Sequence, residues 1–242
     1  MPESKRIALL IDCDNVSHTA IEGVLEELAK HGIVNVRHAH GDWNNPSLSG
    51  WAEKLHPHAI RPMQQFAYTK GKNATDSAMI IDAMDLLYSG NVDAFALMTS
   101  DSDFTPLVLR ILESGFPVYG FGEKKTPAPF VDSCSPFIYI ENLVSSAASE
   151  AERGAEPARK SKAKLRQNSA LVRLLRTAVD QAADDDGWAN MGQVASYIAN
   201  NNSSFSSVNY GYRRISDLIK ATDLFDIELR NGTAMYIRDP KG

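Results

Sequence analysis

Two apolar segments of the chain end in closely spaced aspartates. RIALLIDCDN closes with Asp12 and Asp14, and AFALMTSDSD closes with Asp101 and Asp103. Carboxylates that converge on one place repel one another and raise each other's pKa unless cations neutralise them. Such oxygen ligands suit hard cations such as Mg²⁺ or Mn²⁺, and two of these ions can activate water for phosphodiester cleavage. The pattern therefore predicts a divalent-cation site with hydrolytic chemistry.

Asp76 is a third candidate for the same site. It stands in the first turn of a helix that is expected to begin at the capping-type residue Thr75. Asp76 lies at the N-terminal edge of the apolar face of that helix, so it can point toward the strand ends. Any one of these aspartates alone is better interpreted as a helix cap, whereas Asp12, Asp76 and Asp101 together favour a functional site. Asp103 can act as a cap or as a ligand.

The segments that position these aspartates alternate between strand and helix patterns. Strands are expected near residues 6–12, 33–41, 59–66, 94–99, 117–121 and 137–140, and helices near 23–32, 47–55, 75–90 and 104–114. This alternation predicts an α/β fold with a mainly parallel sheet and helices on both faces. Ligand crevices in such sheets lie beyond the carboxyl ends of the strands, so Asp12 and Asp101 are expected at one rim.

The pattern changes after residue 143, where the first domain (1–143) is expected to end. Residues 144–165 are small, polar and charged, without apolar periodicity, which predicts a flexible linker. The remaining segment, 166–242, contains three helix patterns and then two strands around Asn231-Gly232, a pair typical of type I′ hairpins. Three helices and a hairpin indicate a small C-terminal winged helix-turn-helix domain.

Composition narrows the class of protein. Of the 242 residues, 43% are hydrophobic and 23% charged, which is typical of a globular chain without a membrane span. The N-terminal apolar run is too short for a secretory signal, and the two cysteines form no CxxC motif, which argues against a disulfide framework or a structural zinc site. A cytoplasmic location is therefore expected.

Charge is distributed unevenly along the chain. Residues 1–144 contain 11 Lys and Arg against 18 Asp and Glu, a net charge of −7. A domain of this sign is not expected to bind nucleic acid with its whole surface, so local basic groups must do so. In the first domain the candidates are Lys72, Lys124 and Lys125, although the segment that holds the last two is equally well interpreted as a flexible turn. The candidates in the C-terminal domain are Arg213, Arg214 and Lys220 on its third helix, with Arg230 and Arg238 on the hairpin.

The histidines of the first domain form a weaker candidate for metal binding. His38 and His40 share one face of an expected strand, but the sequence indicates no third ligand beside them. Ordinary core or surface histidines are therefore the better interpretation. On the helix that carries Asp76, we interpret Asp85 as solvated surface, and the sequence leaves the role of Asp82 open.

Three segments resemble the NYN domain family, a branch of the PIN-like nucleases that includes the LabA-like proteins. They are Asp12-Cys13-Asp14-Asn15, GKNATDSAMIIDAMDLL and TSDSDFTPLVLRILESGFPVYGFG, and the resemblance spans about residues 6–143. It implies a PIN-like fold and metal-dependent ribonuclease activity. The acidic site that the resemblance implies consists of Asp12, Asp76, Asp101 and Asp103, with Asn15 completing the first motif. Ser100 occupies a position where many relatives have glycine, and Asp14 occupies a variable one.

The C-terminal segment, about residues 166–239, resembles the LOTUS (OST-HTH) domain, a winged-helix module associated with RNA binding. The resemblance depends on the pattern of elements and on GWANMGQVASYI. It implies RNA, single-stranded or structured, as a partner. A winged helix used for protein contact remains an alternative, as does assembly into a homo-oligomer.

The leading hypothesis is therefore a Mg²⁺- or Mn²⁺-dependent ribonuclease. One alternative is a phosphatase of the haloacid-dehalogenase type, because Asp12-Cys13-Asp14-Asn15-Val16 fits the DxDx[TV] pattern of that family, with Asp12 as nucleophile and Asp14 as acid/base. No convincing lysine motif supports it, and Asp76 has no role in that chemistry. A non-catalytic RNA-binding adaptor is the second alternative, and the intact carboxylate set argues against it.

Overall fold

The structure, a computed structural model, describes residues 4–64, 74–144, 159–230 and 234–240. The chain divides into two compact units, Met1–Ala151 and Glu152–Gly242. Among the described helices, none combines the length and the apolar character needed to cross a lipid bilayer.

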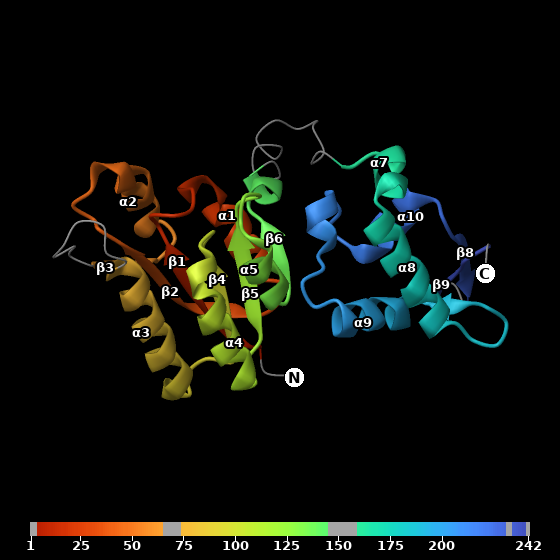
Figure 1. Ribbon diagram of the computed structural model, residues 1–242, viewed down its shortest axis with the longest axis horizontal. Helices are drawn as coiled ribbons and strands as arrows, with labels where there is room; N and C mark the ends of the chain where they lie inside the picture. Colours follow the sequence, from red (N-terminus) through yellow and green to blue (C-terminus); the bar gives the residue numbers. More distant parts are fainter. Residues whose placement is uncertain (1–3, 65–73, 145–158, 231–233, 241–242) are drawn as a thin grey trace. The chain divides into compact units, whose positions relative to one another are not determined.

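The first unit is built on a six-stranded sheet in the order β3-β2-β1-β4-β5-β6, and every pairing is parallel (Figure 1). Its strands are β1 (Arg6–Asp12), β2 (Ile33–Gly41), β3 (Arg61–Gln64), β4 (Ala94–Met98), β5 (Val118–Gly122) and β6 (Phe137–Tyr139). The chain adds β2 and β3 on one side of β1 and then returns to add β4 on the other side. The predicted α/β fold is confirmed, and β1 and β4 flank the point where the strand order reverses.

Helices cover both faces of this sheet. They are α1 (Ile21–Leu28), α2 (Ser49–Leu55), α3 (Ala74–Ser89), α4 (Thr105–Glu113) and α5 (Ala128–Ser133), with 3-10 turns η1 (His18–Ala20), η2 (Pro46–Leu48) and η3 (Ser102–Phe104). Leu10 of β1 shares a buried cluster with Met79 of α3, Val108 of α4 and Phe130 of α5, so these three helices cover one face (Figure 1). The alternate β1 residues, such as Leu9, are equally buried on the opposite face.

The first unit departs most clearly from the expected pattern at α1 and α5. The helix expected over 23–32 ends at Leu28, because Lys30 and His31 donate to carbonyls only three residues earlier and so close a tighter turn. α5 was not expected, since prolines flank and interrupt its sequence, yet its Phe130 is completely buried. Neither difference displaces the strand ends that carry the aspartates.

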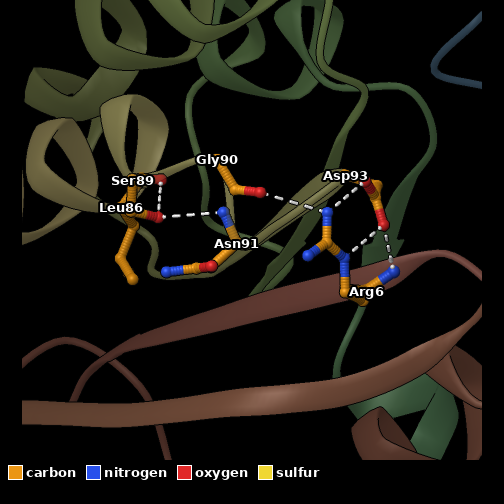
Figure 2. A network of polar contacts seen from close by, with 6 residues as sticks. All are labelled: Arg6, Leu86, Ser89, Gly90, Asn91 and Asp93. Carbon is orange, nitrogen blue, oxygen red and sulfur yellow. Dashed lines mark hydrogen bonds and ion pairs between the residues drawn. The ribbon is translucent and has the colours of Figure 1, made fainter.

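A polar network fixes the end of the sheet opposite to those aspartates (Figure 2). The Arg6 guanidinium at the start of β1 donates to both carboxylate oxygens of Asp93, at 2.9 and 3.0 Å, and to the Gly90 carbonyl oxygen at 3.2 Å. Hydrogen bonds from Arg6 lower the pKa of Asp93 to about 2. The network joins β1 to the connection between α3 and β4, so the two central strands are held in register at their amino ends.

The second unit combines helices with a small antiparallel sheet in the order β7-β9-β8. Its elements are α7 (Lys162–Gln167), α8 (Ser169–Ala182), β7 (Ala189–Asn190), α9 (Met191–Asn201), η4 (Ser207–Tyr210), α10 (Ile215–Thr222), β8 (Asp226–Arg230) and β9 (Ala234–Arg238). The predicted helices and paired strands are confirmed. The expected turn at Asn231-Gly232 lies outside the described residues.

The prediction of a flexible linker over 144–165 is wrong for the C-terminal end of that segment. α7 begins at Lys162, and Leu165 is completely buried in the core of the second unit. Arg166 donates to the backbone carbonyl of Thr222, which attaches α7 to the end of α10. One apolar residue in a short basic helix gives no periodicity, so the sequence pattern could not reveal it. Residues 145–158 lie outside the described part of the chain.

Candidate active site

Asp12 is the most deeply buried of the predicted site residues. Asp12 lies two residues after Leu10 on β1, so both side chains point to the face covered by α3. The exposed fraction of Asp12 is 0%. One oxygen, Oδ2, accepts hydrogen bonds from the Thr99 hydroxyl at 2.7 Å and from the Asn15 side-chain amide at 2.8 Å. The other, Oδ1, is buried without a hydrogen-bond partner among the described residues. Burial raises the pKa of Asp12, and such an unpartnered oxygen is costly unless a cation or a proton satisfies it.

Asp101 lies across the strand-order reversal from Asp12. Its backbone N–H donates to the Thr99 hydroxyl oxygen at 3.1 Å, so the Thr99 side chain contacts both aspartates. The Oδ1 atom of Asp101 accepts the backbone N–H of Asp103 at 2.9 Å and caps η3. Asp101, not Asp103, is therefore the capping residue, and Asp103 is exposed in the first turn of η3.

Asp76 occupies the first turn of α3, as predicted. Its pKa is raised to about 6, first by burial and then by the charges of Asp12, Asp101, Asp103 and Asp14. A helix N-terminus normally favours a carboxylate, so burial and the acidic neighbours together outweigh this effect at Asp76. The structure thus places all the other predicted aspartates within electrostatic reach of Asp76.

The aspartates are nevertheless not drawn tightly together. Among the described residues, the group of His, Cys, Asp or Glu side chains with three ligand atoms within 4.8 Å of one another is His38, His40 and Asp82, and not the aspartate set. Mg²⁺ usually keeps several waters and binds through one or two carboxylates plus substrate phosphate, which an open set permits. An oxygen-only set with an unpartnered Asp12 Oδ1 therefore fits a hard divalent cation.

The supporting residues have defined contacts. Asn15 orients Asp12, as described, and the Ser100 hydroxyl accepts the backbone N–H of Glu123 at 2.9 Å, which ties the loop after β4 to the loop after β5. α3 begins at Ala74, so the expected cap at Thr75 is wrong. The Thr75 hydroxyl donates instead to Asp14 Oδ2 at 3.1 Å.

The lysines predicted to contact RNA differ in their surroundings. Lys124 and Lys125 are exposed after β5, but the Lys125 ammonium forms an ion pair with Glu123 at 2.8 Å. The backbone N–H of Lys124 donates to Glu141 at 2.8 Å. Acidic neighbours therefore reduce the positive charge of this turn. Lys72 lies outside the described residues.

His38 and His40 do have a third ligand-type neighbour, contrary to the sequence-based expectation. Both point from β2 toward α3, where Asp82 Oδ2 lies 2.7 Å from His38 Nδ1 and 3.0 Å from His40 Nε2. Burial opposes ionisation of Asp82, but the hydrogen bonds with the two histidines outweigh it and hold its pKa well below the usual range. Asp82 is distant in sequence, so only the packing of α3 on β2 could reveal this group.

The second unit carries the predicted basic residues at two places. Arg213, Arg214 and Lys220 are exposed, but Arg213 and Arg214 precede α10 rather than lying on it, as Arg214 is its N-cap. The backbone at Arg214 is extended, so the helix begins only at Ile215.

Aromatic rings accompany the arginines of the hairpin, a feature that the sequence reasoning missed. The Arg230 guanidinium lies 4.4 Å from the ring centre of Tyr236 and 5.3 Å from that of Trp188, and Arg238 lies 4.8 Å from Trp188. Acidic groups are also present, since Arg238 pairs with Asp226 at 3.0 Å. This arrangement offers stacking surfaces as well as charge.

Comparisons with known proteins identify both units. The NYN domain model matches residues 6–141, and the OST-HTH/LOTUS domain model matches residues 166–237. A crystal structure of a protein of unknown function from Vibrio parahaemolyticus RIMD 2210633 is 22% identical, with a TM-score of 0.49, over 58% of this chain and 95% of that one. A solution structure of an uncharacterized protein from Nitrosomonas europaea is 40% identical, with a TM-score of 0.26, over 28% of this chain and 70% of that one. No curated protein matches the chain.

Proposed function

Since this chain belongs to the NYN domain family, whose domains are PIN-like nucleases, we propose that it is a metal-dependent ribonuclease. In this proposal Asp12, Asp76, Asp101 and Asp103 hold Mg²⁺ or Mn²⁺ and an RNA phosphodiester is hydrolysed beside them. The observation that carries the proposal is the buried Asp12, whose Oδ1 has no hydrogen-bond partner among the described residues while its neighbours are also acidic. A buried carboxylate with a purely structural role normally has hydrogen-bond donors or a cationic side chain at both oxygens.

Each residue has a separate task in the proposed reaction. A bound cation would supply positive charge for the scissile phosphate and for activation of water. Thr99 and Asn15 fix the Oδ2 atom of Asp12, so that Oδ1 is the atom left for a cation. Asp101 is held through its own backbone N–H and through its cap of η3, which leaves little freedom for its side chain. Asp76 and Asp103 complete the negative charge of the site.

We assign RNA capture to the C-terminal unit, because LOTUS domains bind RNA and the first unit is net acidic. The exposed Arg213, Arg214 and Lys220 would contact phosphates. Trp188 and Tyr236, which already stack against Arg230, would accept unpaired bases. Connection of the two units in one chain raises the concentration of bound RNA near the aspartates.

A cleavage assay tests the nuclease proposal. Full-length protein is incubated with labelled single-stranded and structured RNA in Mn²⁺, Mg²⁺ or EDTA, beside the Asp101→Asn variant. The matched control is Asp85→Asn, since Asp85 is exposed on α3. We expect cleavage that requires a divalent cation and is lost only in Asp101→Asn. Binding of RNA without cation-dependent cleavage would contradict the proposal and identify an adaptor.

The phosphatase alternative is disfavoured by the environment of Asp12. Phosphatase chemistry has no role for Asp76, whereas here Asp76 lies within electrostatic reach of Asp12 and Asp101. The proposed acid/base, Asp14, accepts a hydrogen bond from Thr75. Assay of Asp14→Asn and Asp76→Asn on RNA and on a small phosphomonoester separates the two chemistries. Greater sensitivity to Asp14→Asn, with hydrolysis of the phosphomonoester, would support a phosphatase.

A further inference from the structure

We propose that His38, His40 and Asp82 form a second metal site, selective for a Zn²⁺-type transition-metal ion and separate from the aspartate site. The two imidazole nitrogens converge on one carboxylate oxygen, at 2.7 and 3.0 Å. All three ligand atoms lie within 4.8 Å of one another. Three ligand atoms this close together can be bound by one ion placed between them.

The positions of the ligands follow from the backbone. His38 and His40 are two residues apart on β2, so both project from the same face of the sheet, and they pair in register with Leu10 and Asp12 of β1. α3 contacts β2 on that face and supplies Asp82. Two rigid elements therefore present the ligands, which keeps them together without help from a loop.

The distances suit a small ion after a small adjustment. Zn²⁺ binds imidazole nitrogen and carboxylate oxygen at about 2.0–2.2 Å, so tetrahedral ligands lie about 3.3 Å apart. The present separations of 2.7 and 3.0 Å are those of hydrogen bonds, and the ligands need only separate by a few tenths of an ångström when an ion replaces the shared protons. The side chains of His38 and Asp82 keep exposed fractions of 14% and 12%, so water can supply a fourth ligand.

Ligand chemistry separates this site from the aspartate site. Imidazole nitrogens suit Zn²⁺, Co²⁺, Ni²⁺ and Cu²⁺, whereas oxygen-only sets suit Mg²⁺ and Mn²⁺. The two sites are neighbours with different ligands, since His40 pairs in register with Asp12 while Asp82 lies further along α3 than Asp76. A transition-metal ion at His38, His40 and Asp82 would hold α3 on β2, and α3 also carries Asp76.

Spectroscopic titration tests the site. Chelator-treated, full-length protein is titrated with Co²⁺, and one equivalent is expected to give the visible absorption bands of tetrahedral nitrogen–oxygen coordination. Excess Mg²⁺ should leave these bands unchanged, and Zn²⁺ should remove them. A thiolate charge-transfer band, or no tetrahedral spectrum at all, would overturn the proposal.

Variants identify the ligands. His38→Gln and Asp82→Asn should raise the Co²⁺ dissociation constant by more than the 10- to 100-fold, roughly, that loss of an outer-shell partner costs. His56→Gln is the matched control, because His56 is exposed in the same unit. Asp12→Asn and Asp101→Asn should retain the spectrum, which distinguishes this proposal from the nuclease proposal. Wild-type affinity in both ligand variants would refute the site.

Melting temperatures keep the test independent of folding defects. Zn²⁺ should raise the melting temperature of wild-type protein and of His56→Gln, because an ion that binds only the folded state stabilises it. It should leave that of His38→Gln unchanged. An equal shift in His38→Gln would place the ion elsewhere and overturn the proposal.

Discussion

The aspartate site and the His38–His40–Asp82 group lie on the same face of one sheet, and α3 contributes a carboxylate to each. In the histidine group, two imidazoles surround the carboxylate and hold its pKa well below the usual range. In the aspartate site, burial and further carboxylates raise the pKa of Asp76 to about 6. The chain can therefore neutralise a buried aspartate on this face, but does not do so at Asp12. A buried carboxylate that keeps acidic neighbours and no cationic partner is typical of a site adapted to a ligand.

The largest difference between the two groups is expected in RNA cleavage. Asp12→Asn should reduce the cleavage rate by more than about 100-fold, since it removes a fixed charge from the reaction centre. Its fold should persist, because the amide can still accept from Thr99 and Asn15. Initial rates of cleavage with Mn²⁺, together with circular dichroism of both proteins, measure this. Comparable loss in Asp85→Asn would show that general charge, rather than the site, controls the rate.

The next effect, on stability, should have the reverse order. In EDTA, Asp82→Asn should lower the free energy of unfolding by about 1.5–3 kcal/mol, because it weakens two charge-assisted hydrogen bonds, one to the half-buried His38 and one to the buried His40. Asp12→Asn should lower it less, since the repulsion that it relieves offsets the lost charge interactions. Urea denaturation of the three proteins decides the order. A larger loss of unfolding free energy in Asp12→Asn than in Asp82→Asn would contradict this prediction.

A smaller effect concerns the pH dependence of stability without metal. The folded pKa of Asp76, about 6, lies above the ordinary value of 3.8, so its contribution is favourable below pH 4 and is lost as the pH rises through 6. Wild-type protein should therefore lose about 1 kcal/mol relative to Asp76→Asn between pH 4 and 7, after allowance for solvent screening. Asp82, with a lowered pKa, contributes stability that is lost on acidification. If the free energy of unfolding changed with pH by the same amount in wild type and in Asp76→Asn, the raised pKa of Asp76 would be refuted.

The smallest effect is expected in the second unit. Replacement of Arg213 and Arg214 with Ala should weaken RNA binding several-fold at low salt, and the slope of log affinity against log salt should fall by about 0.7 for each lost contact with single strands. Cleavage at saturating RNA should remain. Fluorescence anisotropy at several salt concentrations measures both quantities. Unchanged affinity and slope would indicate that this winged-helix unit binds RNA through another surface or contacts protein instead.

Most of the first unit could be predicted because its signals are local. A buried strand that ends in Asp12 and another that leads to Asp101 are visible in the sequence, and parallel strands place their ends together. The features that the sequence did not predict depend on packing between distant parts of the chain. Asp82 meets residues 42 and 44 positions earlier in the chain, so its role depends on how α3 lies on β2. Leu165 is one apolar residue in a basic segment, and only its burial shows that α7 is folded.

The Thr99 hydroxyl connects Asp12 to the backbone of Asp101. This hydroxyl has one hydrogen, which points to Asp12, while its oxygen receives the backbone N–H of Asp101. The two aspartates are thus connected through one hydroxyl group, which can rotate about the Cβ–Oγ1 bond of Thr99. If Asp12 were protonated and donated to this oxygen, the Thr99 hydroxyl hydrogen would have to turn to another acceptor, while the second lone pair of the oxygen could still accept the Asp101 N–H. The charge state of the buried carboxylate therefore decides where the Thr99 hydroxyl hydrogen points, without any movement of the sheet.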